Sequence, residues 1–132
     1  MDRLAKRLVT ARKALETLKE LLGPDSPTKI ERDAAIQRFE YTFEAMWKTA
    51  KQYLLDIEGL DIGSPKGVIR GFFQNGVLNE EQTNLALSMV DDRNLTSHTY
   101  DETLAKQIFH QLDDYANLMD KWLQTMEDKY TP

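Results

Sequence analysis

Cysteine is absent from this chain of 132 residues, which excludes disulfide bridges and zinc sites with thiolate ligands. Histidine is scarce, and His98 and His110 lie too far apart in sequence to form a local metal pair. No apolar run approaches the roughly 20 residues that cross a bilayer, and the charged N-terminus lacks the apolar segment of a signal peptide. The sequence therefore predicts a soluble, cytoplasmic protein without a metal or other cofactor.

Most short catalytic motifs are missing as well. The segment "GSPKG" contains glycines and a lysine but lacks the spacing of a phosphate-binding loop, and it fits a turn followed by a proline-led helix start better. Neither a zinc-binding H-E-x-x-H motif nor a G-x-S-x-G nucleophile elbow occurs. These absences exclude the common nucleotide-hydrolase, zinc-protease and serine-hydrolase patterns.

Charge is unevenly distributed along a chain whose net charge is −5. Residues 1–19 are rich in lysine and arginine, whereas residues 101–128 are rich in aspartate and glutamate. These two segments could lie side by side or bind different partners, although solvent-exposed helix faces of opposite sign are the simpler interpretation. The overall negative charge disfavours nonspecific nucleic-acid binding by the whole surface.

Helical spacing of apolar residues dominates the sequence, with no alternation typical of strands. The first predicted helix ends at Gly23-Pro24 and carries one apolar stripe, which consists of Leu4, Leu8, Ala11, Leu15, Leu18 and Leu22. A second helix is expected over residues 28–58, starting at a Thr28–Glu31 capping box or at Ser26-Pro27. Its stripe contains Phe39, Phe43, Met46, Trp47, Ala50, Leu54 and Ile57.

Three further helices complete the predicted fold. Ser64 caps a short helix that Asn75-Gly76 ends, and Asn79 with Gln82 opens a fourth helix that runs toward Arg93. The last helix begins near Asp101 and has a nearly heptad stripe, formed by Leu104, Ile108, Leu112, Tyr115, Met119, Trp122 and Met126. These stripes predict an all-α, compact antiparallel bundle of four to five helices, forming a single domain over residues 1–132.

One polar segment between the fourth and last helices could carry chemistry. It reads "VDDRNLTSHTY" (residues 90–100), and its Arg93 and His98 could simply be residues of a helix end, with Arg93 paired to a nearby acid such as Asp92. Asp91 and Asp92 also lower the positive potential that a phosphate site requires. Yet the arginine guanidinium binds phosphate oxygens well, and histidine exchanges protons near neutral pH. The two side chains together could therefore also catalyse metal-free phosphodiester cleavage.

Three blocks of sequence resemble one known family in the same order. They are "RFEYTFEAMWKTAKQYL" (38–54), "SPKGVIRGFFQNG" (64–76) and "RNLTSHTYDE" (93–102), the last of which fits an R-x4-H-x-Y pattern. The match runs from about residue 30 to the C-terminus. The chain resembles HEPN-domain proteins of the HepT type, in the branch of nucleotidyltransferase substrate-binding proteins.

The resemblance implies a dimeric helical bundle, a minimal nucleotidyltransferase partner and, in toxin–antitoxin members, a metal-independent ribonuclease that the partner silences. It assigns Arg93 and His98 as the catalytic pair, Asn94 as the supporting polar residue and Tyr100 as the site of AMP transfer. The alternative is a non-catalytic subunit that binds substrate for the nucleotidyltransferase. The complete arginine–histidine pair favours the ribonuclease, because docking alone does not need it.

Two arguments lead us to expect a homodimer. One histidine cannot easily deprotonate the RNA 2′-hydroxyl and protonate the leaving 5′-oxygen at once, so a second copy would supply the second group. The chain also has large apolar side chains that could cover a subunit interface, namely Phe72, Phe73, Trp122 and Met126. The other notable side chains are expected to be structural, with Trp47 and Trp122 in a core or interface and His110 structural or on the surface.

Overall fold

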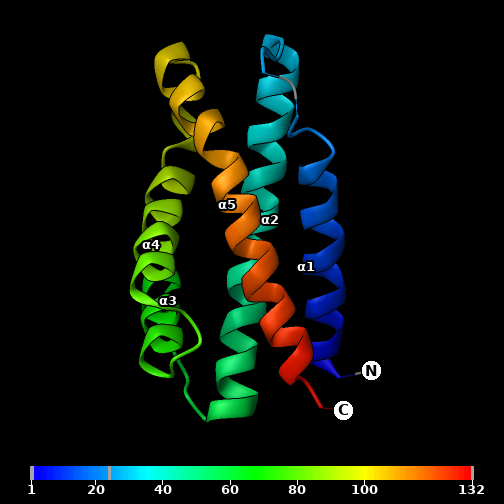
Figure 1. The fold of residues 1–132 in the computed structure, drawn as a ribbon, viewed down its shortest axis with the longest axis vertical. Helices are drawn as coiled ribbons and strands as arrows, with labels where there is room; N and C mark the ends of the chain where they lie inside the picture. The colour runs from blue at the N-terminus through cyan, green and yellow to red at the C-terminus, as the bar shows by residue number, and fades with distance from the viewer. Residues whose placement is uncertain (1, 24, 132) are drawn as a thin grey trace.

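The computed structural model describes residues 2–23 and 25–131 and is built from helices (Figure 1). The elements in chain order are α1 (Arg3–Lys19), α2 (Lys29–Glu58), α3 (Pro65–Gln74), α4 (Glu80–Asn94), the 3₁₀ helix η1 (Thr96–His98) and α5 (Glu102–Lys129). No strand occurs among these described residues. The predicted all-α fold with four to five longer helices is confirmed.

The helices form an elongated bundle around α2 (Figure 1). Helix α2 contacts α1, α3, α4, η1 and α5, while α3 and α4 form a pair on one side of it. Helices α1 and α5 also pack on each other, and both chain ends lie at the same end of the bundle. The hydroxyl of Tyr130 donates a hydrogen bond of 2.7 Å to the Asp2 carboxylate there.

Local capping chemistry sets most helix boundaries where the sequence predicts them. Thr28 forms the complete capping box with Glu31, so the alternative start at Ser26-Pro27 is wrong. Asn79 and Gln82 form a second capping box, and the Ser64 hydroxyl accepts the Gly67 N–H at 3.1 Å. The first helix stops at Lys19, before the predicted Gly23-Pro24 end, and Pro24 lies outside the described residues.

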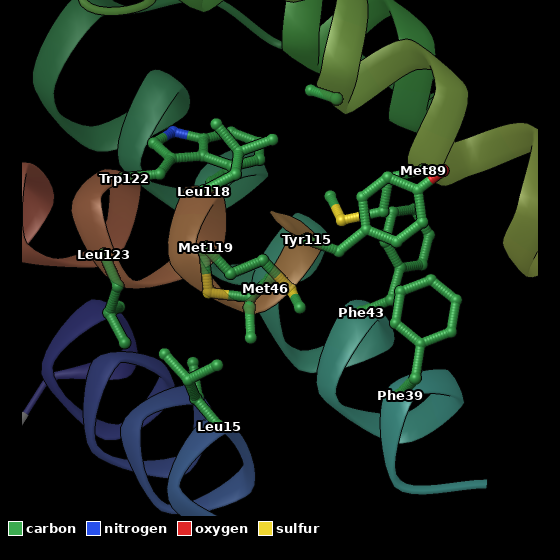
Figure 2. Packing of buried hydrophobic residues seen from close by; sticks show 14 of the residues in the cluster. Leu15, Phe39, Phe43, Met46, Met89, Tyr115, Leu118, Met119, Trp122 and Leu123 are labelled. Carbon is green, nitrogen blue, oxygen red and sulfur yellow. The ribbon is translucent and has the colours of Figure 1, made fainter. Parts of the chain in front are cut away.

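The core consists of the apolar stripes, which meet around α2 (Figure 2). The stripes of α1 and α5 are buried as predicted, apart from the partly buried Leu104 and the turn residue Leu22. Trp47 is also only partly buried, and the prediction for Ile57 is wrong because 43% of it is exposed near the end of α2. Aromatic contacts join different helices, including Phe39 on Tyr115 with ring centroids 5.6 Å apart.

The large apolar side chains that we attributed to a subunit interface belong largely to this core. Phe72, Trp122 and Met126 are buried within the bundle, where Phe72 and Trp122 meet edge to face with centroids 5.1 Å apart. Phe73 alone of that set is exposed, at 46%. The four residues were therefore a poor argument for dimerisation, because three of them fill the interior of a single copy.

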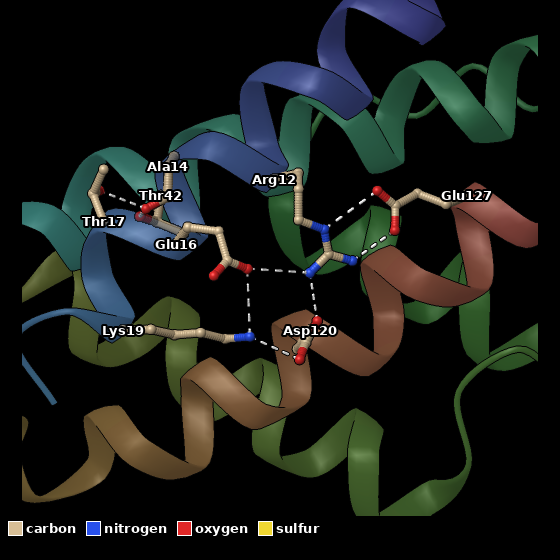
Figure 3. A network of polar contacts seen from close by, with 8 residues as sticks. All are labelled: Arg12, Ala14, Glu16, Thr17, Lys19, Thr42, Asp120 and Glu127. Atoms are coloured by element: carbon tan, nitrogen blue, oxygen red, sulfur yellow. Dashed lines mark hydrogen bonds and ion pairs between the residues drawn. The ribbon is translucent and has the colours of Figure 1, made fainter. Parts of the chain in front are cut away.

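A cluster of charged side chains joins α1 to α5 (Figure 3). Arg12 binds Glu127 at 2.6 Å and also contacts Asp120, while the Lys19 ammonium lies 2.8 Å from Asp120. Hydrogen bonds from Lys19 and then Arg12 lower the pKa of Asp120 below its ordinary value of 3.8. The basic first segment and the acidic last one thus lie side by side.

We expect Asp120→Asn to reduce the free energy of unfolding by about 1 kcal/mol at pH 7, because partly exposed ion pairs contribute modestly and this pair belongs to a network. A carboxylate whose pKa is lower in the folded state than in the unfolded state stabilises the folded protein at pH values above its unfolded pKa. This contribution is lost as the pH falls through the folded-state pKa. The deficit should therefore shrink below about pH 3.8. Urea unfolding of both proteins across pH measures it.

Asp113→Asn is the matched control, since Asp113 is an exposed acid of the same helix outside this cluster. If the two variants lose the same free energy of unfolding, the effect comes from removing one negative charge from the protein and not from breaking the α1–α5 contact.

Candidate functional site

The segment between α4 and α5 is a tight, hydrogen-bonded connection. The Leu95 N–H bonds to the Asp92 carbonyl at 3.0 Å, and the Thr96 hydroxyl bonds to the Arg93 carbonyl at 2.7 Å. Asp101 then caps α5 by accepting the Leu104 N–H at 3.2 Å. Because these bonds satisfy the carbonyl groups at the end of α4, the chain turns sharply and keeps residues 93–100 in one place.

Two residues anchor this connection to the bundle. The buried Tyr115 hydroxyl donates a short hydrogen bond to the Asp92 carboxylate, and Thr96 is buried beneath the turn. Burial, followed by the bond to Asp92, raises the pKa of Tyr115 well above its usual range, so the tyrosine stays protonated and remains the donor. The backbone that carries Arg93 is therefore fixed from its core side.

Arg93 reaches back to α2, where its guanidinium pairs with Glu44. The two side chains are 36% and 32% exposed, and the Arg93 Nε atom is buried without a hydrogen-bond partner. They border a pocket of about 530 Å³, here called the Arg93 pocket, which is lined by Phe43, Glu44, Trp47, Ser64, Pro65, Lys66, Val90, Arg93 and Asn94. Arg93 is thus held by an acid on another helix, and not by Asp92.

Glu44 was missed in the sequence analysis. Its signal was a carboxylate placed between the apolar Phe43 and Met46 of the α2 stripe, where an unpaired charge would be costly. The Trp47 indole N–H also donates to Glu44, at 3.2 Å. Glu44 therefore links Arg93 to Trp47, and all three residues line the pocket.

The other predicted site residues follow Arg93 along the connection. Asn94 is exposed and shares the Arg93 pocket, whereas His98 is exposed at the end of η1 and is not among the residues that line that pocket. Tyr100 is 85% exposed, and its ring lies edge-on to His98 with centroids 6.0 Å apart. The structure thus places Asn94 beside Arg93 and Tyr100 beside His98, with no bond between Arg93 and His98.

The acids next to Arg93 are occupied elsewhere. Asp91 pairs with Lys66 at 2.7 Å, and Asp92 accepts the hydrogen bond from Tyr115. Because each is engaged away from the guanidinium, they reduce its positive potential less than their places in the sequence suggest. Lys66 adds a cation to the wall of the Arg93 pocket.

The remaining predictions concern side chains outside this segment. Trp122 is a core residue, and His110 lies on the surface beside Phe109. Over residues 2–23 and 25–131, no three potential metal-ligating side chains gather into one cluster. None of the helices in that part of the chain combines the length and apolar character needed to cross a membrane.

Known proteins resemble this fold over most of its length. A protein of Thermus thermophilus with a known crystal structure is 58% identical, with a TM-score of 0.87 over 88% of this chain and 98% of its own. A Haemophilus influenzae protein, described as having the fold of a substrate-binding domain of a nucleotidyltransferase, has a TM-score of 0.76 and 23% identity over 91% of this chain and 98% of its own. At that identity, the second likeness supports the fold alone.

Sequence comparison gives the same relationship. A protein of Haemophilus influenzae named as a probable ribonuclease HepT is 35% identical over 85 residues, which are 61% of this chain and 57% of that protein. The match thus spans little more than half of the relative. The family model described as nucleotidyltransferase substrate binding protein like matches residues 6–128. The chain therefore belongs to this family of proteins described as nucleotidyltransferase substrate binding protein like.

Proposed function

We propose that this protein is a metal-independent endoribonuclease, the toxin of a pair whose antitoxin is a minimal nucleotidyltransferase that transfers AMP to Tyr100. One observation carries the proposal: Arg93, Asn94 and His98 emerge toward solvent from a single connection whose other residues fix it to the core. A mere helix end does not need this combination of a rigid backbone and exposed chemical groups.

The Arg93–Glu44 pair suits exchange with a phosphate. A partly exposed ion pair contributes only about 1 kcal/mol, so an RNA phosphate can replace Glu44 at small cost. The guanidinium then places two donors on the phosphate oxygens and stabilises the charge of the pentacoordinate transition state. Glu44 acts as a positioning residue, which holds the arginine at the edge of the pocket before RNA binds.

The proposed reaction requires two proton transfers. His98 accepts the proton of the RNA 2′-hydroxyl as that oxygen attacks the adjacent phosphorus, and the bond to the 5′-oxygen breaks. The 5′-oxygen must gain a proton as it leaves, and the products are a 2′,3′-cyclic phosphate and a 5′-hydroxyl. A second copy of the chain would donate that proton through its own histidine.

A non-catalytic role is the second candidate. The family description itself concerns substrate binding for a nucleotidyltransferase, and an arginine already paired with Glu44 could serve recognition alone. In that case the protein binds a nucleotide acceptor for its partner and leaves RNA intact. Direct measurement of RNA cleavage separates the two functions.

Arg93→Ala and His98→Ala should each lower RNA cleavage at least about a hundredfold, because one removes charge stabilisation and the other proton transfer. Cleavage by the unaltered protein should persist in EDTA. A labelled-RNA assay, with thermal melting of every variant, tests this prediction. His110→Ala is the matched control, being the other exposed histidine; equal loss there, or activity that requires added magnesium, contradicts the mechanism.

The two-histidine mechanism predicts that the active species is a homodimer at micromolar concentration. Light scattering coupled to size exclusion gives the mass, and cleavage is assayed in the same fractions. Activity that remains with a monomeric species would refute the sharing of histidines between copies.

Modification of Tyr100 should silence the protein. The phenol oxygen attacks the α-phosphorus of ATP on the nucleotidyltransferase, pyrophosphate leaves, and the phenol proton is released to solvent or a base of the partner. The resulting phosphodiester places negative charge and bulk beside His98, whose ring Tyr100 already contacts. Incubation with a candidate nucleotidyltransferase and ATP should therefore add one AMP mass and suppress cleavage.

Tyr100→Phe should keep cleavage yet escape both the added mass and the silencing. Tyr41→Phe is the matched control, because Tyr41 is also partly exposed but lies on α2. Peptide mapping that places AMP on another residue, or silencing that persists in Tyr100→Phe, contradicts this assignment.

A further inference from the structure

A strongly basic surface lies between α1 and α2 and has no role in the chemistry described above. It comprises two adjoining pockets of about 310 Å³ and 400 Å³. Both pockets are lined by Arg3, Arg7 and Lys48, while Lys6 borders the first and Lys51 the second. We call the surface formed by these five residues the basic groove.

The basic groove adjoins the Arg93 pocket through two residues of α2. Glu44, the partner of Arg93, also lines the first pocket of the groove. Trp47 lines both the second pocket and the Arg93 pocket, and its side chain is only partly buried. A chain that lies in the groove can therefore pass over α2 to reach Arg93.

The cations of the groove are poorly neutralised. Arg3, Lys6 and Arg7 form no ion pair within residues 2–23 and 25–131, and Lys51 pairs with an aspartate that is 77% exposed. Lys48 lies 3.9 Å from Glu44, which already binds Arg93. By contrast, Arg12 farther along α1 is bound by the acids of α5.

Burial adds to the demand for an anion. The Arg7 Nε atom is buried and has no hydrogen-bond partner. An unsatisfied donor of a charged group is costly, and five cations so close together repel one another. A bound polyanion would offset the repulsion among the cations and the charge of the Arg7 guanidinium, although the buried Nε itself lies out of its reach.

We propose that the basic groove binds the phosphodiester backbone of single-stranded RNA next to the linkage held at Arg93. This inference rests on the proposed ribonuclease function and adds the path of its substrate. Successive phosphates of a single strand can follow the cations that line the recess between the two helices. A flat surface on an acidic protein would hold an RNA backbone less well. Trp47, at the junction, offers an aromatic ring for one unpaired base, as in other proteins that bind single strands.

The test is RNA binding in the His98→Ala background, so that cleavage cannot consume the probe. Fluorescence anisotropy of a labelled single-stranded RNA, repeated over a range of salt concentrations, gives Kd and its salt dependence. Lys6→Glu combined with Lys48→Glu should weaken binding by about tenfold or more. The log–log salt slope should fall by roughly 1.4, because each lysine–phosphate pair accounts for roughly 0.7. Both lysines are exposed, so the fold should persist.

Lys29→Glu is the control that matches each single groove substitution in charge, so Lys6→Glu and Lys48→Glu are also measured one at a time. Lys29 is exposed at the start of α2, roughly 28 Å along the helix from Lys48 at 1.5 Å per residue. The control should bind RNA like the background protein. Equal binding by the control and the groove variant, or no salt-dependent binding by either, overturns the proposal.

Two further measurements distinguish the RNA-binding groove from a protein-docking surface and from the proposed ribonuclease function. If the groove variant binds RNA normally but loses affinity for a nucleotidyltransferase, the surface docks a protein and the RNA path is refuted. If the protein with His98 intact never cleaves RNA while groove-dependent binding persists, the ribonuclease proposal fails and the RNA-binding groove stands.

Discussion

The burial of α2 on several sides is the constraint on which the rest of the structure depends. A helix of 30 residues with large apolar side chains must be covered by its neighbours, and α2 contacts each of the other four α-helices as well as η1. The same helix carries Glu44, Trp47 and Lys48 at its partly exposed edges. Packing and surface chemistry are therefore coupled through one element.

This coupling explains how a short connection can hold the candidate site residues in place. Tyr115 fixes Asp92 from α5, and Glu44 holds the Arg93 guanidinium from α2. The first contact comes from a buried tyrosine and sets the backbone, whereas both partners of the second are partly exposed, so that this pair can be exchanged. Since the energetic cost of exchange is small, ligand binding at Arg93 need not disturb the core.

Local features of the sequence predicted the fold well because their physical causes are local. Thr28 and Asn79 bond to backbone groups three residues away, and the α5 stripe follows directly from helical geometry. The sequence did not predict features that depend on contacts between residues far apart in the chain. The pairing of Arg93 with Glu44 spans 49 positions, and burial of Phe72 against Trp122 depends on how α3 meets α5.

The α5 contacts also govern when the molecule can acquire its final shape. During synthesis α1 and α2 can associate early, whereas Arg12 must wait for the acids near the other end of the chain. The Asp92 carboxylate likewise lacks its Tyr115 donor until α5 has been made. A nascent chain would thus present residues 93–100 held only by contacts with α2, such as the Arg93–Glu44 pair, and the segment would gain its second anchor only after α5 leaves the ribosome.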